Sequence, residues 1–124
     1  EVLRWATPVL HMRRTATRDH VLDGTRIAEG DKVVIWHISA NRDEAVFPGA
    51  EAFDISRANA RRHLSFGFGV HRCVGARLAE IQIQILIEEM VARRMTAHIT
   101  GEPELAAQSF VHGYMRLPVT LSRG

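Results

Sequence analysis

The most chemically distinctive stretch of the sequence surrounds its only cysteine. In "FGFGVHRCVGARLAE", Cys73 lies two residues after His71, among Gly67, Gly69 and Gly75, and directly before an apolar helical pattern. A thiolate is a strong metal ligand and a good nucleophile. Because a helix follows, the dipole and the free N–H groups of its first turn are predicted to point towards the sulfur.

The glycines around the cysteine predict a loop that lies close to a flat partner. Gly69 and Gly75 have no Cβ, so the backbone there can approach a ligand closely and adopt positive φ. N–H groups of such a loop can donate to the sulfur and tune a bound metal. The pattern is therefore compatible with a thiolate site for a metal-bearing group.

Three other interpretations of the cysteine stay open at this point. A single cysteine is often a small buried hydrophobic residue. A zinc site would use His63, His71 and Cys73, although the chain has no second cysteine and no paired C-x-x-C spacing. A catalytic thiol would need a histidine positioned beside it, and the sequence does not decide that contact.

The composition limits the class of protein. The chain has 124 residues, of which 46% are hydrophobic and 24% charged, as in a globular domain with a core. No apolar run is long enough to span a membrane. A single cysteine forms no internal disulfide, so we expect a reducing, cytoplasmic location.

The basic residues do not indicate a nucleic-acid-binding protein. The formal net charge is +2, and Lys32 is the only lysine among sixteen basic residues. Arginine favours fixed bidentate contacts with carboxylates and phosphates. No dense basic run with interleaved aromatic residues occurs, so nucleic-acid binding is not predicted.

Two helices are predicted to flank the chemistry. Residues 76–95 form a long helix whose apolar residues cover much of its circumference, which indicates burial on more than one side. Residues 1–5 form the end of a helix that stops before Pro8. Since the first residue is Glu1 and no capping residue precedes it, we expect this segment to continue a longer chain.

Short strands and an irregular segment are predicted between the helices. Residues 11–19 have the extended character of a strand, and Asp23-Gly24 predicts a hairpin turn. Residues 32–38 form a buried strand by their β-branched content. Ser39 or Asn41 begins a short helix.

The remaining segments have weaker patterns. Residues 48–63 are long and irregular, which is typical of a functional segment. The tail has a strand at residues 96–100, a turn at 101–103 and two more short strands around Gly113.

The spacing around the cysteine resembles the haem-ligand signature of the cytochrome P450 family. That signature is Phe, two residues, Gly, one residue, Arg or His, one residue, Cys, one residue and Gly, before a small or apolar run. The matching residues are Phe66, Gly69, His71, Cys73 and Gly75, with Leu78 and Ala79 behind them.

The resemblance continues along the chain. "EVLR" is similar to the Glu-x-x-Arg motif of the family's K helix, through Glu1 and Arg4, and "FDISR" is similar to the segment that supplies Arg57 to that pair. It implies an α+β fold, the C-terminal fragment of a bacterial, soluble P450. Its parts are a short K-helix remnant, small β-sheets, an irregular meander, the cysteine-ligand loop, a long L helix and a C-terminal β-hairpin. Residues 1–124 would be one incomplete domain without the I helix and the N-terminal part.

The resemblance also implies roles for individual residues. Cys73 would be the axial thiolate ligand of haem b. His71, Arg14 and His63 would contact the haem propionates, and Phe66 would pack against the ring. Gly67, Gly69 and Gly75 would shape the loop.

Glu1, Arg4 and Arg57 would form a buried structural triad. Without the match at Arg57, the spacing of Glu1 and Arg4 would indicate an ordinary i,i+3 ion pair on a helix surface. Val9, Leu10, Phe110 and Val111 would face substrate. An acidic, ferredoxin-type redox partner would dock on the basic residues Arg61, Arg62, Arg72 and Arg77.

The implied function is that of a monooxygenase. It would use O₂ and two electrons to hydroxylate a hydrophobic small molecule, a sterol or a lipid. The family's proton-relay helix would lie outside residues 1–124, so no residue of this chain is assigned a catalytic role, and the chain alone is expected to be inactive and to hold haem weakly or not at all. Exposed apolar surface on the long helix would favour self-association. The alternatives are a truncated, haem-free relic with a structural or self-association role, and a thiol or metal protein that uses Cys73 with His71.

Overall fold

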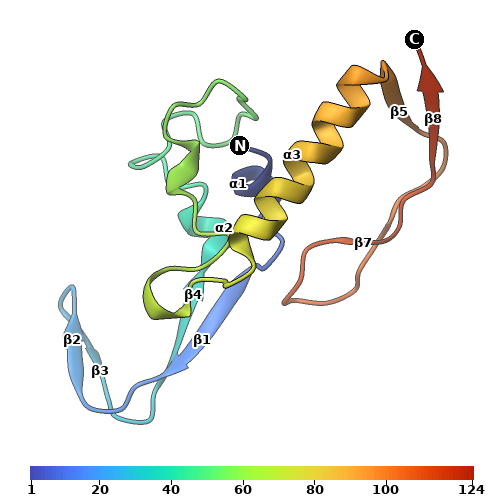
Figure 1. The fold of residues 1–124 in the computed structure, drawn as a ribbon. Helices are drawn as coiled ribbons and strands as arrows, with labels where there is room; N and C mark the ends of the chain where they lie inside the picture. Colours follow the sequence, from blue (N-terminus) through green and yellow to red (C-terminus); the bar gives the residue numbers. More distant parts are fainter. The chain divides into compact units, whose positions relative to one another are not determined.

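The computed structural model describes all 124 residues, which divide into two compact units, Glu1–Ser65 and Phe66–Gly124. Figure 1 shows the order of the elements along the chain. Each unit is described by itself below. No helix of the chain is both long enough and apolar enough to cross a lipid bilayer.

The first unit contains two small antiparallel sheets and three short helices. Its elements are α1 (Val2–Ala6), β1 (His11–Thr15), β2 (His20–Leu22), β3 (Thr25–Ile27), β4 (Lys32–Trp36), α2 (His37–Ala40) and η1 (Ala60–Arg62). Strand β1 pairs with β4, and β2 pairs with β3 between them in the sequence. The hairpin predicted from Asp23-Gly24 is confirmed.

The boundaries around β1 and β4 differ from the sequence prediction. Strand β1 ends at Thr15 instead of Asp19: Ala16 still exchanges backbone bonds with Asp31 and Gly30, and the chain then leaves for the hairpin. Strand β4 ends at Trp36, two residues earlier than predicted, and α2 begins there. Asn41 therefore follows the helix as its C-cap instead of starting it.

Strand β4 is not buried, so the burial predicted from its β-branched residues was wrong. Val34, Ile35 and Trp36 are all substantially exposed. The physical reason is that β-branched residues fit a pleated surface whether or not another layer covers it. In a two-stranded sheet with β1 as the only partner, both faces can stay open.

The core of the first unit comes from the irregular segment. Phe47 and Ala50 are almost completely buried, although no strand or helix includes them. The carboxylate of Glu44 accepts hydrogen bonds from the N–H groups of Gly49 and Ala50, at 2.8 and 2.9 Å. A side chain therefore replaces the ladder that a regular element would provide.

The second unit contains one long helix and two nested strand pairs. Its elements are η2 (Gly69–His71), α3 (Ala76–Ala92), β5 (Met95–Ile99), β6 (Glu104–Leu105), β7 (Tyr114–Arg116) and β8 (Val119–Arg123). Strand β5 pairs with β8 and β6 pairs with β7, all antiparallel. The strands after Gly113 therefore pair with earlier strands and not with each other.

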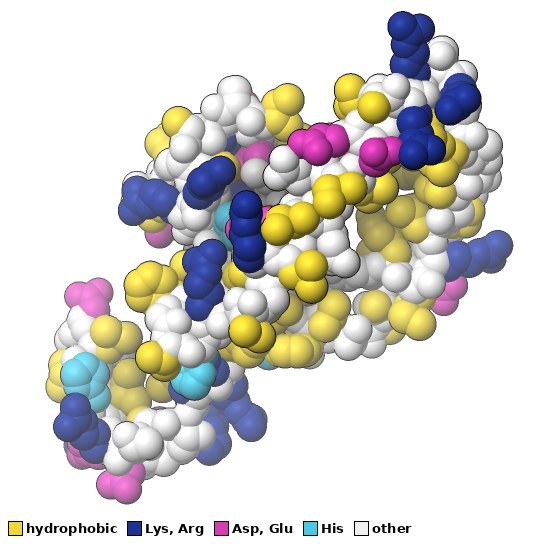
Figure 2. Space-filling view, in the orientation of Figure 1, with side chains coloured by type: hydrophobic (Ala, Val, Ile, Leu, Met, Phe, Trp, Pro, Cys, Tyr) yellow, Lys and Arg dark blue, Asp and Glu magenta, His cyan; other side chains and the backbone are white.

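Helix α3 is shorter and more exposed than the sequence predicted. It ends at Ala92, because Arg94 adopts a left-handed conformation (φ 52°) and Met95 already belongs to β5. Of its residues only Ala76 is buried, and Figure 2 shows hydrophobic side chains along its surface. The other elements of this unit are short strands and one turn of helix, which are too small to cover the circumference of α3.

The buried Phe47 gives a direct test of the core. We expect Phe47→Ala to lower the free energy of unfolding by about 3 kcal/mol, because it leaves a cavity where a ring with 1% exposure had packed. The matched control is Ile55→Ala, whose side chain is 83% exposed and whose loss should change stability by about 0.5 kcal/mol or less. Urea unfolding followed by tryptophan fluorescence measures both, and equal losses would contradict this account of the core.

Candidate functional site

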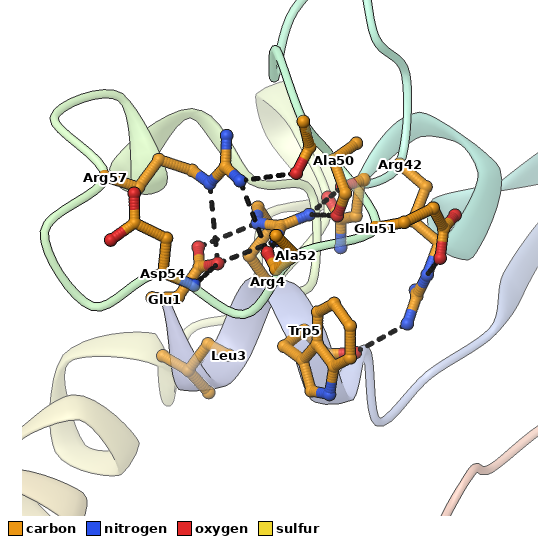
Figure 3. Close-up of polar contacts among 12 residues, drawn as sticks. Glu1, Leu3, Arg4, Trp5, Arg42, Ala50, Glu51, Ala52, Asp54 and Arg57 are labelled. Carbon is orange, nitrogen blue, oxygen red and sulfur yellow. Dashed lines mark hydrogen bonds and ion pairs between the residues drawn. The ribbon is translucent and has the colours of Figure 1, made fainter.

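Arg4 lies in the interior of the first unit with no exposed surface. Its Nε and Nη2 donate to the two carboxylate oxygens of Glu1, both at 2.7 Å (Figure 3). The remaining N–H groups donate to the carbonyl oxygens of Asn41, Ala50 and Ala52, at 2.6, 3.0 and 3.1 Å. A guanidinium has five N–H donors, so these five bonds use all of them.

Arg57 approaches the same carboxylate from the irregular segment. Its Nε lies 3.4 Å from Glu1 Oε1, and its side chain is 7% exposed. Its two terminal nitrogens donate to the carbonyl oxygens of Pro48, Gly49 and Ala52. The structure thus brings Glu1, Arg4 and Arg57 together in one buried group, here called the charge cluster.

The charge cluster changes the acidity of its carboxyl group. The pKa of Glu1 is lowered from 4.5 to about 2, mainly by the hydrogen bonds from Arg4. Burial opposes this shift, while the N–H of Asp54 at 3.0 Å and the Arg57 side chain support it. Glu1 and Arg4 are therefore no surface pair: their side chains are 3% and 0% exposed.

The sequence did not single out Asn41 as a binding residue, although the structure makes it a junction. Its fully buried side chain donates from Nδ2 to the hydroxyl oxygens of Thr7 and Ser65, both at 2.9 Å. Its Oδ1 accepts from the N–H of Leu64 at 2.7 Å. A polar residue next to a short helix was the only available signal, and it gives no information about partners far along the chain.

The glycine-rich loop that leads to α3 opens the second unit. Cys73 is a free, exposed thiol whose backbone N–H donates to Phe66 O at 2.8 Å. Gly67 and Gly69 have φ values of 72° and 65°, in the left-handed region that favours glycine. The hydrogen bond closes the loop, and the glycines supply the turns that it needs.

The backbone of Gly75 and the position of the thiol differ from two expectations about this loop. Positive φ is confirmed at Gly69 but wrong at Gly75, whose φ is −83° because it is already the N-cap of α3. A Cβ on Gly75 would lie 3.7 Å from the sulfur of Cys73, so the thiol lies against this residue. The exposed sulfur contradicts the alternative of a buried hydrophobic cysteine.

The histidines give no support to a zinc site. The structure contains no group of three or more His, Cys, Asp or Glu side chains that could hold a metal ion. His63 follows η1 in the first unit, where its Nδ1 accepts from the N–H of Ser65 at 3.1 Å. His71 lies in η2 of the second unit and is exposed.

The other predicted residues are divided between the two units. Arg14 lies in β1, where it is half-buried and donates to Arg13 O. The residues predicted to face substrate are mainly half-buried, and those predicted to face a redox partner are exposed. The residues predicted to face substrate are Val9 and Leu10 in the first unit and Phe110 and Val111 in the second. The residues predicted to face a redox partner are Arg61 and Arg62 in the first unit and Arg72 and Arg77 in the second.

Comparisons with known proteins agree on one family. Residues 1–106 match the family model described as Cytochrome P450. The chain is 46% identical over 123 residues to a methyl-branched lipid omega-hydroxylase of Mycobacterium tuberculosis, covering 98% of this chain and 28% of that protein. It is 44% identical over 121 residues to linalool 8-monooxygenase of Pseudomonas putida, covering 98% of this chain and 30% of that protein.

A solved structure gives the same result at the level of the fold. Cytochrome P450-153 from Novosphingobium aromaticivorans superposes with a TM-score of 0.93 and 56% identity, covering 97% of this chain and 30% of that one. The chain therefore spans less than a third of the length of these relatives.

The lowered pKa of Glu1 predicts a loss of stability in acid. Between pH 4.5 and about 2 the unfolded chain binds a proton at this carboxyl group that the folded chain does not, so the free energy of unfolding falls as the pH falls. The full contribution, up to about 3 kcal/mol, is present above that range. Urea unfolding at several pH values should give a shallower dependence for Glu1→Gln, and identical slopes would contradict the assignment.

The saturated guanidinium predicts a large cost for removing Arg4. We expect Arg4→Met to lower the free energy of unfolding by about 3–5 kcal/mol, because the carbonyl groups of Asn41 and Ala50 stay buried without a donor and Glu1 keeps only the N–H of Asp54 and the longer contact with Arg57. Arg26→Met is the matched control: Arg26 pairs with Asp19 at 2.9 Å, but the two side chains are 76% and 58% exposed. That pair should contribute about 1 kcal/mol or less. Chemical unfolding compares the two variants, and a similar cost for both would refute the argument.

Proposed function

The chain belongs to the cytochrome P450 family, and we propose that residues 1–124 are the C-terminal, haem-binding part of a monooxygenase. The observation that carries this proposal is the exposed thiol of Cys73 in a glycine-rich loop directly before α3. The names of its relatives, a lipid hydroxylase and a linalool monooxygenase, support the reaction class. Because the chain spans less than a third of their length, the activity is assigned to a longer protein.

The residues present fit a flat, iron-bearing group. A thiol that serves as a metal ligand must be accessible, and Cys73 is exposed. A Cβ on Gly69 would meet nothing within 4 Å, so there is open space beside the loop backbone. We therefore propose haem b as the cofactor and Cys73 as its axial ligand.

The loop residues are assigned the tasks of holding the ligand. The bond from Cys73 N to Phe66 O keeps the thiol at the end of a closed loop, with Gly67 and Gly69 as its turns, while Gly75 follows the loop as the N-cap of α3. Phe66 would shield the sulfur from water. When bound, haem supplies the iron at which O₂ is cleaved with two electrons and two protons, so that one oxygen atom enters the substrate and the other leaves as water.

Three basic side chains are proposed to neutralise the haem propionates. They are Arg14 and His63 in the first unit and His71 in the second. Arg14 suits a carboxylate, because its guanidinium presents several N–H donors in one plane. No residue of this chain is assigned to proton delivery, so we propose that the chain alone does not catalyse the reaction.

The substrate is proposed to be a hydrophobic small molecule. The relatives named above act, by their names, on a methyl-branched lipid and on linalool. Val9, Leu10, Phe110 and Val111 are the residues of this chain proposed to line its path, and their apolar side chains suit such a ligand. A sterol, which the sequence resemblance also implied, stays a prediction.

The electron donor is proposed to be an acidic, ferredoxin-type protein. Arg61, Arg62, Arg72 and Arg77 are exposed, and complementary charge speeds the encounter of two proteins. Arg77 already faces Glu80 at 3.5 Å, which makes it the weakest of the four. The single thiol favours a reducing compartment, so we propose the cytoplasm as the location.

A haem-free role in self-association is the alternative, and the exposure of α3 favours it. Leu78, Leu86 and Val91 are each at least 60% exposed. Exposed apolar side chains on one helix promote association. A chain that takes up no haem but sediments as a dimer or larger species would support this alternative.

The carbon monoxide complex of the reduced, haem-loaded chain tests the proposal. A thiolate-ligated haem gives a red-shifted Soret band that a histidine-ligated haem does not give. We expect this band with the unchanged sequence and its complete loss in Cys73→Ala, whereas His112→Ala, an exposed histidine elsewhere in the same unit, should keep it. A histidine-type band in the unchanged chain, or an unaltered band in Cys73→Ala, would contradict the proposal, whereas no haem uptake would support the haem-free alternative.

A further inference from the structure

We infer that Asn41 is a positioning residue that couples the charge cluster to the start of the loop bearing Cys73. The inference rests on the proposed function, since it assigns Asn41 a task in placing the thiolate ligand. Its basis is the set of contacts that one buried side chain makes with the last residues before the loop.

The first step is the attachment of residues 64 and 65. Asn41 Oδ1 accepts from Leu64 N at 2.7 Å, and Asn41 Nδ2 donates to Ser65 Oγ at 2.9 Å. The same hydroxyl group donates to Leu3 O at 2.6 Å. These two residues directly precede Phe66, so their position decides where the loop begins.

The second step is the link to the charge cluster. The carbonyl oxygen of Asn41 accepts from Arg4 Nη1 at 2.6 Å. Asn41 Nδ2 also donates to Thr7 Oγ1, which in turn donates to Arg4 O at 2.7 Å. Arg4 is held on both its backbone and its side chain, so Asn41 takes its position from a rigid, saturated guanidinium.

The third step is that neither aspartate nor alanine reproduces this pattern. Aspartate keeps an acceptor for Leu64 but loses both donated bonds and adds a buried charge. Alanine loses all the side-chain bonds and leaves Leu64 N without its partner. Thr7, Asn41 and Ser65 are buried and Leu64 is half-buried, so each lost hydrogen bond leaves a polar group without water or a partner and carries a desolvation cost.

Hydrogen exchange separates positioning from general stability. We expect Asn41→Ala to speed exchange of the Cys73 amide by about tenfold, although this amide bonds to Phe66 O and does not touch Asn41. Amides of the β5–β8 pair, in the same unit, should keep their rates. Unchanged exchange at Cys73, or equal acceleration in β5–β8, would overturn the inference.

Asn59→Ala is the matched control. Its amide also donates to a carbonyl oxygen in the first unit, that of Val46 at 2.5 Å, but it is not bonded to residues 64 and 65. It should leave Cys73 exchange unchanged, and an effect as large as that of Asn41→Ala would refute the inference. Ser65→Ala is the milder variant if Asn41→Ala does not fold. It removes the bond from Asn41 to the Ser65 hydroxyl but keeps the bond from Leu64 N to Asn41 Oδ1, and it should also accelerate exchange of the Cys73 amide.

The haem-loaded chain provides an independent readout. Asn41→Ala and Asn41→Asp should lower the fraction of the carbon monoxide complex with the thiolate-type band by about fivefold or more relative to Asn59→Ala. An equal fraction in all variants would overturn the inference. If the unchanged chain takes up no haem or gives a histidine-type band, exchange at Cys73 alone decides whether Asn41 positions the loop. The histidine-type band would also contradict the proposed function.

Discussion

The first unit depends on a single buried guanidinium. Arg4 has no exposed surface, and its five N–H donors are shared between the Glu1 carboxylate and three backbone carbonyl groups. A buried charge is tolerable only when it is paired and fully hydrogen-bonded. The irregular segment between α2 and η1 must therefore place its carbonyl groups around Arg4, which gives a segment without regular structure one defined path.

This constraint explains how a region without a hydrophobic layer has a core. Phe47 and Ala50 are buried beside Arg4, whose guanidinium carbon lies 5.3 Å from the ring centre of Phe47. The Arg57 side chain and the Glu44 carboxylate bind further backbone groups of the same segment. Polar side chains bind the backbone groups that would be paired in a β-sheet. The proposed haem loop begins directly after Leu64 and Ser65, which are bonded to this network.

Much of the local structure could be predicted from short-range patterns. The hairpin at Asp23-Gly24, the helix after Gly75 and the strand from Lys32 follow from turn chemistry and periodicity, which act between neighbouring residues. The start of α2, the exposure of β4 and the length of α3 did not follow. Each depends on what covers or caps the element, which neighbouring residues do not specify.

The sequence by itself determined the family and the place of the cysteine loop, because the spacing of Phe66, Gly69, His71, Cys73 and Gly75 is a local, specific pattern that the family comparison bears out. Only the tertiary structure decided that Asn41 joins Thr7, Leu64 and Ser65, and that Glu1 meets Arg57. These bonds join residues 23 to 56 positions apart, and they depend on the directions in which backbone carbonyl and N–H groups point after folding. A residue's type shows which bonds it can make, but only the folded backbone selects its partners.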